Sequence, residues 1–447
     1  MKFKKTLILL IIFLVLLTLV YFLEIKHKGE TDTEDKFVYF PSENIQKIVF
    51  KKQDHSMIFI KQESGDWFIL EPIEAKADSY EINRLVESFS DLKSERTVEE
   101  VPSNLEKYGI PQREISLHIK DIKLPVKILI GIENPLDKTF FAKRDDETRV
   151  VLIPSFLKDI LEKDVFDFRQ KDIFKFETEE VKKVKLRAKK IQWECTKKDE
   201  DWLLKKPVKA LAEKTKIENL LHSLSNIKAK EFISEDKQRQ QIKKYALLEA
   251  EYEVFLYMPA TNKEVKFSLS KKDDKTYATT SISSKIIEVD NSMLSNLEKD
   301  AEEMRDKKVA HFYTWDVDRL YIKRKNMELG FVKSEDKWNF ESKTLKEAEK
   351  EKIENFLRKI ENLEAVGFID PPLNLKDYGL HNPQAEIKIG IKEDEDEIKE
   401  ITIIVGSEDE QTKEVVLKNA RLDYLFKTNS EFLKEFPDKE DSWEKHE

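Results

Sequence analysis

Cysteine is almost absent from this chain, because Cys195 is the only one among 447 residues. A single cysteine excludes an intrachain disulfide and a cysteine-based metal cluster. It leaves the cellular compartment open, since a protein without disulfides can reside in any compartment. Cysteine use therefore does not indicate where the protein works.

Glycine is scarce as well, with 9 in the whole chain. Enzymes that bind phosphates on glycine-rich loops carry G-x-x-x-x-G-K or G-x-G-x-x-G, and neither pattern occurs. G-x-S-x-G and H-E-x-x-H are missing too, and no two of the seven histidines have ligand spacing on a helix face. The sequence thus predicts no catalytic residue, no cofactor and no metal ligand, and a protein that is not an enzyme.

An excess of positive charge is also lacking. Lys and Arg number 80 against 89 Asp and Glu, for a net charge of −9. A nucleic-acid binder needs a basic face, so we expect no nucleic-acid partner, and no small-molecule substrate is evident. The acidic run Glu393–Glu397 has neither the spaced ligands nor the central glycine of a calcium loop. We interpret that run as a solvated hairpin loop.

A long apolar run is present near the N-terminus. Residues 6–23 contain no charge, and 18 residues of helix span about 27 Å, close to the thickness of a bilayer core. Lysines flank the run on both sides, with a modest excess before it, which favours an N-terminus inside the cell. A cleaved signal peptide and a buried core helix are the alternatives. The stretch predicts an uncleaved single-pass anchor, with residues 26–36 as a polar stalk and the bulk of the chain extracytoplasmic.

The remaining sequence repeats itself three times. Phe40, Phe176 and Phe312 are spaced by 136 residues, and each opens a similar segment. Tryptophan, isoleucine and tyrosine landmarks recur at nearly the same period, which is the size of a domain rather than of a solenoid repeat. These landmarks are Trp67, Trp202 and Trp338, then Ile82, Ile217 and Ile353, then Tyr108, Tyr245 and Tyr378. The sequence predicts an anchor at 1–36 and repeats at 37–172, 173–308 and 309–447.

The periodicity inside each repeat predicts an α+β fold. Short alternating runs between residues 45 and 69 indicate three antiparallel strands. Residues 78–95 then place apolar side chains at helical spacing, and alternation resumes after the tyrosine. We therefore expect an N-terminal transmembrane helix followed by three tandem repeats, each a strand-rich antiparallel unit around an amphipathic helix.

The aromatic landmarks and the other residues that mark the repeats form a structural signature that suggests no chemistry. The structural signature comprises Phe40, Trp67, Pro72, Tyr108, Gly109, Arg169, Phe176, Trp202, Pro207, Tyr245, Arg305, Phe312, Trp338, Tyr378 and Gly379.

The phrase Leu-x-x-Tyr-Gly followed by proline occurs at 105–111 and again at 375–383. Glycine adopts a left-handed backbone at little cost, so Gly109 and Gly379 are predicted to end a turn with positive φ. Repeat two has Ala246 at this position and no nearby proline. We expect Ala246 to have a negative φ and its turn to differ.

The most basic strand-like stretch is 182–190. Val184, Leu186 and Ala188 should face inward, while the alternating cations face outward. One interpretation is an edge strand whose lysines prevent pairing with another chain. The other is a candidate patch for an anionic ligand. The residues of that patch are Lys183, Lys185, Arg187 and Lys189.

These landmarks resemble a known family. Trp-x4-Pro, an acid before the helix, the Tyr-Gly phrase and Arg-x-Lys before the next copy are similar to the bacterial domain-of-unknown-function family 4340, from about Phe37 to the end. Repeat two departs at Ala246, and repeat three has Lys343 where the proline would be. The resemblance implies one membrane span with tandem extracytoplasmic domains, often encoded beside ABC transporters of the gliding-motility type. It supplies no catalytic residues.

The resulting hypothesis is a single-pass protein of the bacterial cytoplasmic membrane. It would act as an extracytoplasmic scaffold or accessory protein in a membrane-protein complex, as partner of an ABC-type transporter. The alternative is a cell-envelope hydrolase that uses a pair of carboxylates.

Overall fold

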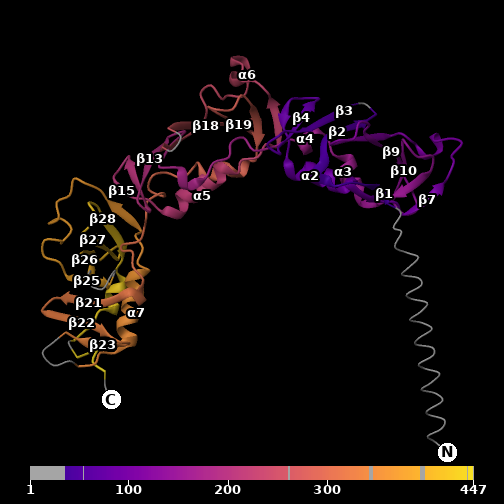
Figure 1. Cartoon of the computed structure of the whole chain (residues 1–447). Coiled ribbons are helices and arrows are strands. Elements are labelled where there is room, and N and C mark those ends of the chain that lie inside the picture. The colour runs from indigo at the N-terminus through magenta and orange to yellow at the C-terminus, as the bar shows by residue number, and fades with distance from the viewer. Residues whose placement is uncertain are drawn as a thin grey trace, which may run out of the picture. The chain divides into compact units, whose positions relative to one another are not determined.

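The computed structural model describes residues 36–445, apart from residues 54, 260–261, 342–345, 393–397 and 440. The expected membrane span at 6–23 and the acidic run at 393–397 lie outside the described residues. Within the described part, no helix is both long and apolar enough to cross a membrane. The chain forms two compact units, the first ending at Lys171 and the second beginning at Asp172 (Figure 1).

Repeat one lies in the first compact unit. Its strands and helices are β1 (Lys36–Tyr39), β2 (Ile45–Lys52), β3 (Ser56–Lys61), β4 (Trp67–Glu71), β5 (Ala75–Lys76), α2 (Ser79–Ser90), β6 (Asp91–Lys93), β7 (Arg96–Glu99), β8 (Arg113–Ile119), β9 (Val126–Glu133), β10 (Phe140–Arg144), β11 (Val150–Ile153), α3 (Lys158–Glu162) and α4 (Val165–Phe168). Short 3-10 helices are η1 (Ser42–Asn44), η2 (Glu106–Tyr108) and η3 (Ser155–Leu157). Nine strands form one sheet in the order β5-β4-β3-β2-β8-β9-β10-β11-β7, and β1 pairs with β6 separately.

Repeat two opens the second compact unit. Its elements are η4 (Thr178–Glu180), β12 (Lys183–Ala188), β13 (Ile191–Lys198), β14 (Asp201–Lys206), β15 (Ala210–Leu211), α5 (Lys214–Ser225), β16 (Glu231–Ser234), α6 (Arg239–Lys244), β17 (Tyr252–Met258), β18 (Lys263–Lys272), β19 (Lys275–Thr280), β20 (Ile286–Val289) and η6 (Asn291–Asn296). Its sheet runs β15-β14-β13-β12-β17-β18-β19-β20-β16.

Repeat three completes the second unit. Its elements are η7 (Thr314–Asp316), β21 (Val317–Arg324), β22 (Met327–Ser334), β23 (Lys337–Phe340), α7 (Lys350–Glu361), β24 (Gly367–Ile369), β25 (Ala385–Lys392), β26 (Ile398–Asp409), β27 (Glu414–Asn419), β28 (Leu425–Asn429) and η8 (Ser430–Glu435). Its sheet runs β23-β22-β21-β25-β26-β27-β28-β24.

The three sheets share one strand order. In each, the first long strand (β2, β12 or β21) pairs on one side with the next strand along the chain (β3, β13 or β22). On the other side it pairs with β8, β17 or β25, the first strand after the turn that contains Tyr108, Tyr245 or Tyr378. We call this turn the tyrosine turn. A strand that follows the main helix closes the far edge of each sheet: β7, which comes after β6, in repeat one, β16 in repeat two and β24 in repeat three. The prediction of strand-rich antiparallel sheets with a few helices is therefore confirmed. The bounds 37–172, 173–308 and 309–447 stay a prediction, and repeats two and three belong to one compact unit.

Each repeat has one amphipathic helix of 12 residues, namely α2, α5 or α7. The Asp78 side chain caps α2 by accepting from the backbone N–H groups of Tyr80 and Glu81. Glu213 and Glu349 occupy the same place without a side-chain cap. The acid before the helix is thus a true cap only in repeat one.

The end of each repeat returns to the start of its own main helix. The backbone N–H groups of Asp78, Glu213 and Glu349 donate to the carbonyl oxygens of Phe168, Met304 and Trp443, at 2.8, 2.9 and 2.8 Å. These bonds satisfy a donor at a helix N-terminus, where intrahelical partners are lacking. The segment that contains Phe168, Met304 or Trp443 therefore completes its repeat, and we call it the closing segment.

The landmark tryptophans and phenylalanines are buried. Trp67, Trp202 and Trp338 are 1–2% exposed, and the equivalent phenylalanines of the three repeats are 8–9% exposed. One hydrophobic cluster fills the first compact unit, and a second one runs through repeats two and three. The landmarks are packing residues, since a buried tryptophan removes a large apolar area from water.

The tyrosine turn gives one confirmed and one wrong prediction. Gly109 and Gly379 have φ of 62° and 71°, as expected. Ala246 also has a positive φ, 57°, so the expectation of a different turn in repeat two is wrong. Its N–H donates to Lys243 and that of Leu247 to Ile242, the same bonds that the glycine turns make. The helix-ending hydrogen bonds impose the left-handed backbone whichever residue is present.

A neighbouring strand explains how repeat two keeps this turn. Gly131 and Gly406 lie under the turn carbonyls of Tyr108 and Tyr378, where an added Cβ would overlap the oxygen. The aligned residue of repeat two is Ser270, whose hydroxyl donates to the Ala246 carbonyl at 2.8 Å and accepts from the Glu251 N–H at 3.1 Å. A hydroxyl contact replaces the close backbone approach.

Candidate functional site

A pocket of about 460 Å³ opens in the second compact unit, where repeat two meets repeat three. Lys190 and Gln192 contribute from the β12–β13 turn and the start of β13, and Pro207 from the end of β14. The segment 300–305 forms another wall, and Phe368 and Asp370 contribute from repeat three. Two signature residues, Pro207 and Arg305, therefore meet here.

Arg305 is the centre of this arrangement and is 3% exposed. Its Nη1 donates to Asp370 Oδ2 at 2.9 Å, and its guanidinium lies 3.8 Å from the Phe368 ring and 4.6 Å from the Tyr424 ring. Burial is compensated by the carboxylate and by two aromatic faces. Arg305 thus joins the end of repeat two to the C-terminal end of β24 and to the loop before β28 in repeat three.

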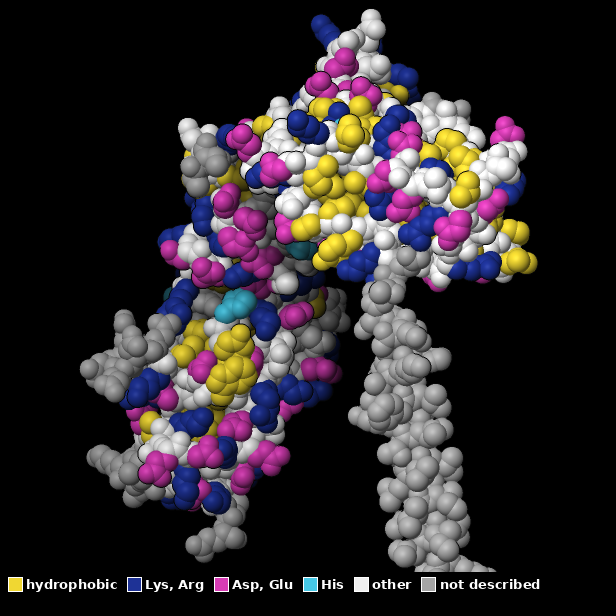
Figure 2. Space-filling view, turned by 45° about the vertical axis from the view of Figure 1, so that its right-hand side comes forward, with side chains coloured by type: hydrophobic (Ala, Val, Ile, Leu, Met, Phe, Trp, Pro, Cys, Tyr) yellow, Lys and Arg dark blue, Asp and Glu magenta, His cyan; other side chains and the backbone are white. Residues whose placement is uncertain are grey.

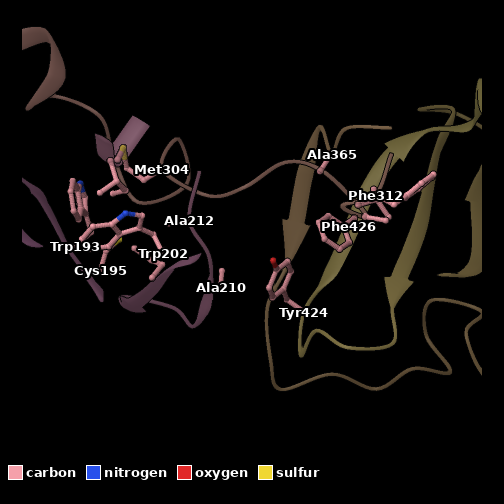
Figure 3. Close-up of a cluster of buried hydrophobic side chains, with 14 of the residues drawn as sticks. Trp193, Cys195, Trp202, Ala210, Ala212, Met304, Phe312, Ala365, Tyr424 and Phe426 are labelled. Carbon is pink, nitrogen blue, oxygen red and sulfur yellow. The ribbon is translucent and has the colours of Figure 1, made fainter. Parts of the chain in front are cut away.

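Tyr424 makes a second link across the same contact. Its hydroxyl accepts from the Leu211 N–H at 3.4 Å, and Figure 3 shows it directed toward Ala210 of repeat two. Burial raises the pKa of Tyr424 to about 12. The phenol therefore stays neutral and acts as a fixed hydrogen-bonding group.

Three polar atoms at this contact have no hydrogen-bond partner among the described residues. They are Nε and Nη2 of Arg305 and Oδ1 of Asp370. These atoms are also shielded from solvent, so a molecule in the pocket does not reach them in this arrangement. A buried unpaired donor costs free energy. The contact of Arg305 with Phe368, Asp370 and Tyr424 links repeats two and three and is not a preformed binding site. We call this contact the latch.

Two carboxylates of the pocket are engaged by other groups of the chain. Asp370 is engaged by Arg305, and Asp300 accepts from the Glu303 N–H at 2.8 Å. Across the described ranges, no group of three His, Cys, Asp or Glu is placed to hold a metal ion. Cys195 is buried, which raises the pKa of its thiol to about 12 and keeps it un-ionised at neutral pH.

The basic strand β12 is not at an edge, so the edge-strand interpretation is wrong. It lies inside its sheet, between β13 and β17. Lys183 pairs with Glu194 at 2.9 Å, and Arg187 is 3.7 Å from Glu253. Glutamates of the flanking strands thus offset the positive charge.

The other two cations of this stretch are engaged as well. Lys185 lies over the Phe255 ring, 5.5 Å from its centroid, and Lys189 follows the strand in a turn. Lys189 pairs with Glu251 and Glu298 at 3.3 and 3.2 Å. Hydrogen bonds that Lys189 makes with Tyr252 and donates to these glutamates raise the pKa of its ammonium group. The anionic-ligand patch stays a prediction, on a surface whose charge is largely compensated.

The two signature tyrosines Tyr108 and Tyr245 make contacts within their own repeats. Tyr108 donates to Glu99 at 2.6 Å, and Tyr245 packs on Tyr277 with centroids 4.6 Å apart. Arg169 is 3% exposed. The partners of Arg305 were not predicted, and Asp370 and Tyr424 lie in loops. Two signals of this contact are present in the sequence: the recurring Arg-x-Lys, and Phe368, which recurs as Phe232 at the period of the repeats.

Three antiparallel sheets of one strand order define a tandem-repeat protein rich in β-structure. Residues 67–241 and 202–383 match the family described as "Domain of unknown function (DUF4340)", and the chain belongs to that family. Each match begins at a repeat tryptophan, Trp67 or Trp202. The family pattern therefore extends from one repeat into the next.

No curated protein matches the chain. Among solved structures, a DNA polymerase sliding clamp from Pseudomonas aeruginosa is 8% identical, with 88% of this chain and 93% of that chain covered and a TM-score of 0.16. DNA polymerase III subunit beta from Borrelia burgdorferi is 8% identical, with 89% and 94% covered and a TM-score of 0.14. Similarity at this level supports no conclusion about fold or function.

Proposed function

We propose that this protein is a membrane-anchored extracytoplasmic scaffold or accessory protein and a partner of an ABC-type transporter complex. The features common to the three repeats are packing features: a buried tryptophan, a tyrosine turn and a closing segment at the helix. An uncharged run of 18 residues at 6–23 supports the anchor. The resemblance to the family described above supports the link to a transporter.

The observation that carries the scaffold proposal is the latch at Arg305. It joins repeats two and three through an ion pair, two ring contacts and the Tyr424 hydroxyl. A shared hydrophobic cluster adds to this contact. A scaffold needs binding surfaces held at a fixed spacing, and domain contacts of this kind restrict relative motion.

Topology is tested by protease treatment of spheroplasts that contain the full chain. We expect digestion of the bulk of the chain, with protection of a short N-terminal fragment that includes residues 6–23. A cytoplasmic protein of the same cells serves as the control for intact membranes. Protection of the whole chain would overturn the extracytoplasmic assignment.

The partner is tested by photo-cross-linking in native membranes. A benzophenone amino acid replaces one exposed side chain at a time in the full chain: Leu136, Leu248 or Trp315, which are 87%, 51% and 68% exposed. The same amino acid at buried Phe59 is the matched control, since it faces the core. We expect a membrane subunit of an ABC transporter to cross-link from at least one exposed site. Recovery of no transporter subunit from all three sites contradicts the proposal.

A further inference from the structure

The β8–β9 hairpin of repeat one has an apolar tip. Ile122 is 52% exposed and Leu124 is 79% exposed, and every residue from Lys120 to Leu124 is exposed. Soluble surfaces carry single exposed apolar residues without consequence. Two large aliphatic side chains at the end of one hairpin form a more unusual feature, because nothing in their own repeat covers them.

The same tip is positively charged. Lys120, Lys123 and Lys127 surround the two aliphatic residues, and Asp121 is the one acid in this segment. The adjacent β10–β11 turn contains acids, but Arg144 pairs with Asp146 and with Glu147. Asp145 is the remaining acid of that turn. The tip combines exposed aliphatic groups with an excess of lysine, as segments that bind membrane surfaces do.

The tip lies at the end of the sheet where the chain enters from its N-terminal segment. Arg144 Nη1 donates to the Phe37 carbonyl at 3.0 Å, and the Asp145 N–H donates to the Lys127 carbonyl at 3.1 Å. Two residues after Phe37, Tyr39 is 64% exposed and carries the Lys36 ammonium 3.6 Å from its ring centroid. An exposed tyrosine beside a lysine is typical of a membrane interface.

The equivalent tips of the other repeats have different sequences. Between β17 and β18 the chain reads Pro-Ala-Thr-Asn, which is uncharged. Between β25 and β26 it reads Glu-Asp-Glu-Asp-Glu at 393–397. The sequence between these two strands changes from basic and apolar, to neutral, to strongly acidic with distance along the chain from residues 6–23. An anionic bilayer would attract the first tip and repel the last. In Figure 2, hydrophobic side chains (yellow) are interspersed with Lys and Arg (dark blue) on the visible face of the first compact unit.

We propose that the Lys120–Leu124 tip, together with Tyr39, docks onto the surface of an anionic phospholipid bilayer. Ile122 and Leu124 enter the headgroup–acyl boundary, and the lysines contact lipid phosphates. This inference rests on the proposed anchor at 6–23. From Leu23 to Lys36 the chain spans 13 residues, which reach at most about 45 Å. A connection of that length allows contact between the tip and the bilayer that holds the anchor.

The test uses the full chain in phosphatidylcholine vesicles with or without phosphatidylglycerol. Leu124→Cys is labelled with the environment-sensitive dye NBD, and buried Cys195 does not compete for the label. Asn262→Cys, at the matched tip of repeat two, is the control. We expect a severalfold rise in NBD fluorescence at position 124 when phosphatidylglycerol is present, and quenching by lipids with a nitroxide on the acyl chain. Position 262 should show neither effect.

A charge-reversal variant and an alkaline wash of the vesicles distinguish failure of the docking inference from failure of the proposed anchor. Lys120→Glu with Lys123→Glu should return the label at position 124 to the fluorescence seen without phosphatidylglycerol. A label at 124 that stays as solvated as the one at 262, in vesicles that retain the protein after an alkaline wash, overturns the docking inference and leaves the anchor intact. Loss of the protein from washed vesicles overturns the anchor, and the docking inference with it.

Discussion

Repeats one and three build their tyrosine turn from glycine pairs, whereas repeat two builds the same turn from Ala246 and Ser270. The backbone is left-handed in all three. In the glycine pairs the tyrosine carbonyl of the turn approaches the neighbouring strand too closely for a Cβ, and in repeat two a serine hydroxyl donates to the carbonyl of the following residue, Ala246. Both residues of the contact differ together, so the structural requirement is the contact and not the glycine.

The largest expected effect comes from adding a Cβ under the turn of repeat three. In Gly406→Ala the new methyl group would overlap the Tyr378 carbonyl oxygen and lie 3.1 Å from that of Val416. Such overpacking should lower the free energy of unfolding by about 3 kcal/mol. Urea denaturation, with hydrogen exchange resolved over β26, measures it. Gly367→Ala, whose nearest neighbour is 3.8 Å away, is the matched control and should change stability little.

Removing the hydroxyl in repeat two should break its version of the contact. Ser270→Ala leaves the Ala246 carbonyl and the Glu251 N–H without this buried partner. The expected loss is about 1–3 kcal/mol by the same denaturation assay. Ser270→Gly should cost less when combined with Ala246→Gly, because the pair of repeats one and three is then restored. Simple additivity of the two changes would contradict the coupling.

The two turn positions should respond in opposite directions. Gly379→Ala forces a side chain into φ of 71° and brings its Cβ to 2.8 Å from the Ser407 nitrogen. A loss of about 1–2 kcal/mol follows from the left-handed backbone alone. Thermal unfolding monitored by hydrogen exchange in repeat three tests it. An unchanged stability would show that the turn relaxes easily.

Ala246→Gly should stabilise repeat two. The alanine has φ of 57°, and glycine removes that strain, while its more flexible unfolded chain offsets part of the gain. The expected net gain is at most about 1 kcal/mol. Hydrogen exchange of the amides in α6 and the following turn is the measurement. A loss of stability would mean that the alanine methyl group makes a contact that outweighs the strain.

The smallest expected effect on stability concerns the two junctions between repeats, at residues 169–176 and 305–312. Asp306 and His311 are paired where the first junction has Gln170 and Lys175. The hydrogen bond to Asp306 raises the pKa of His311 above its usual 6.5. A raised folded-state pKa adds stability below about pH 6.5, and that stability is lost as pH rises through the folded pKa.

The pair is partly exposed, so the contribution should stay below about 1 kcal/mol. Denaturation midpoints between pH 5 and 8 measure it, and His311→Gln should remove the dependence. A stability that instead rises with pH across this range in the parent chain, but not in the variant, would contradict the assignment.

The elements that the sequence predicts well are those set by local pattern. The alternation from Ile45 to Ile69 predicts β2, β3 and β4, and the helical spacing from Ile82 to Phe89 predicts α2. The position of β12 was not predictable, because its neighbour β17 begins 64 residues after Ala188. Pairing over that distance depends on the assembled sheet rather than on local alternation.

The candidate site was predictable only in part. Arg305 recurs in the sequence at the period of the repeats, so its importance could be inferred. Its partners Asp370 and Tyr424 lie in loops, where periodicity carries no information. The positive φ of Ala246 was missed because propensity ranks alanine low in that backbone, while the surrounding hydrogen bonds determine it.

The closing segment at each main helix has a consequence for which changes in the gene leave a foldable chain. Trp443 completes α7 although it lies 94 residues after Glu349, so a nonsense mutation at codon 443 would remove the carbonyl that accepts from the backbone N–H at the start of this helix. In repeats one and two the residues beside the closing segment also lead into the following copy. A duplication or deletion in the gene preserves folding when its breakpoints fall at this junction, because only then is a whole repeat added or removed together with its closing segment.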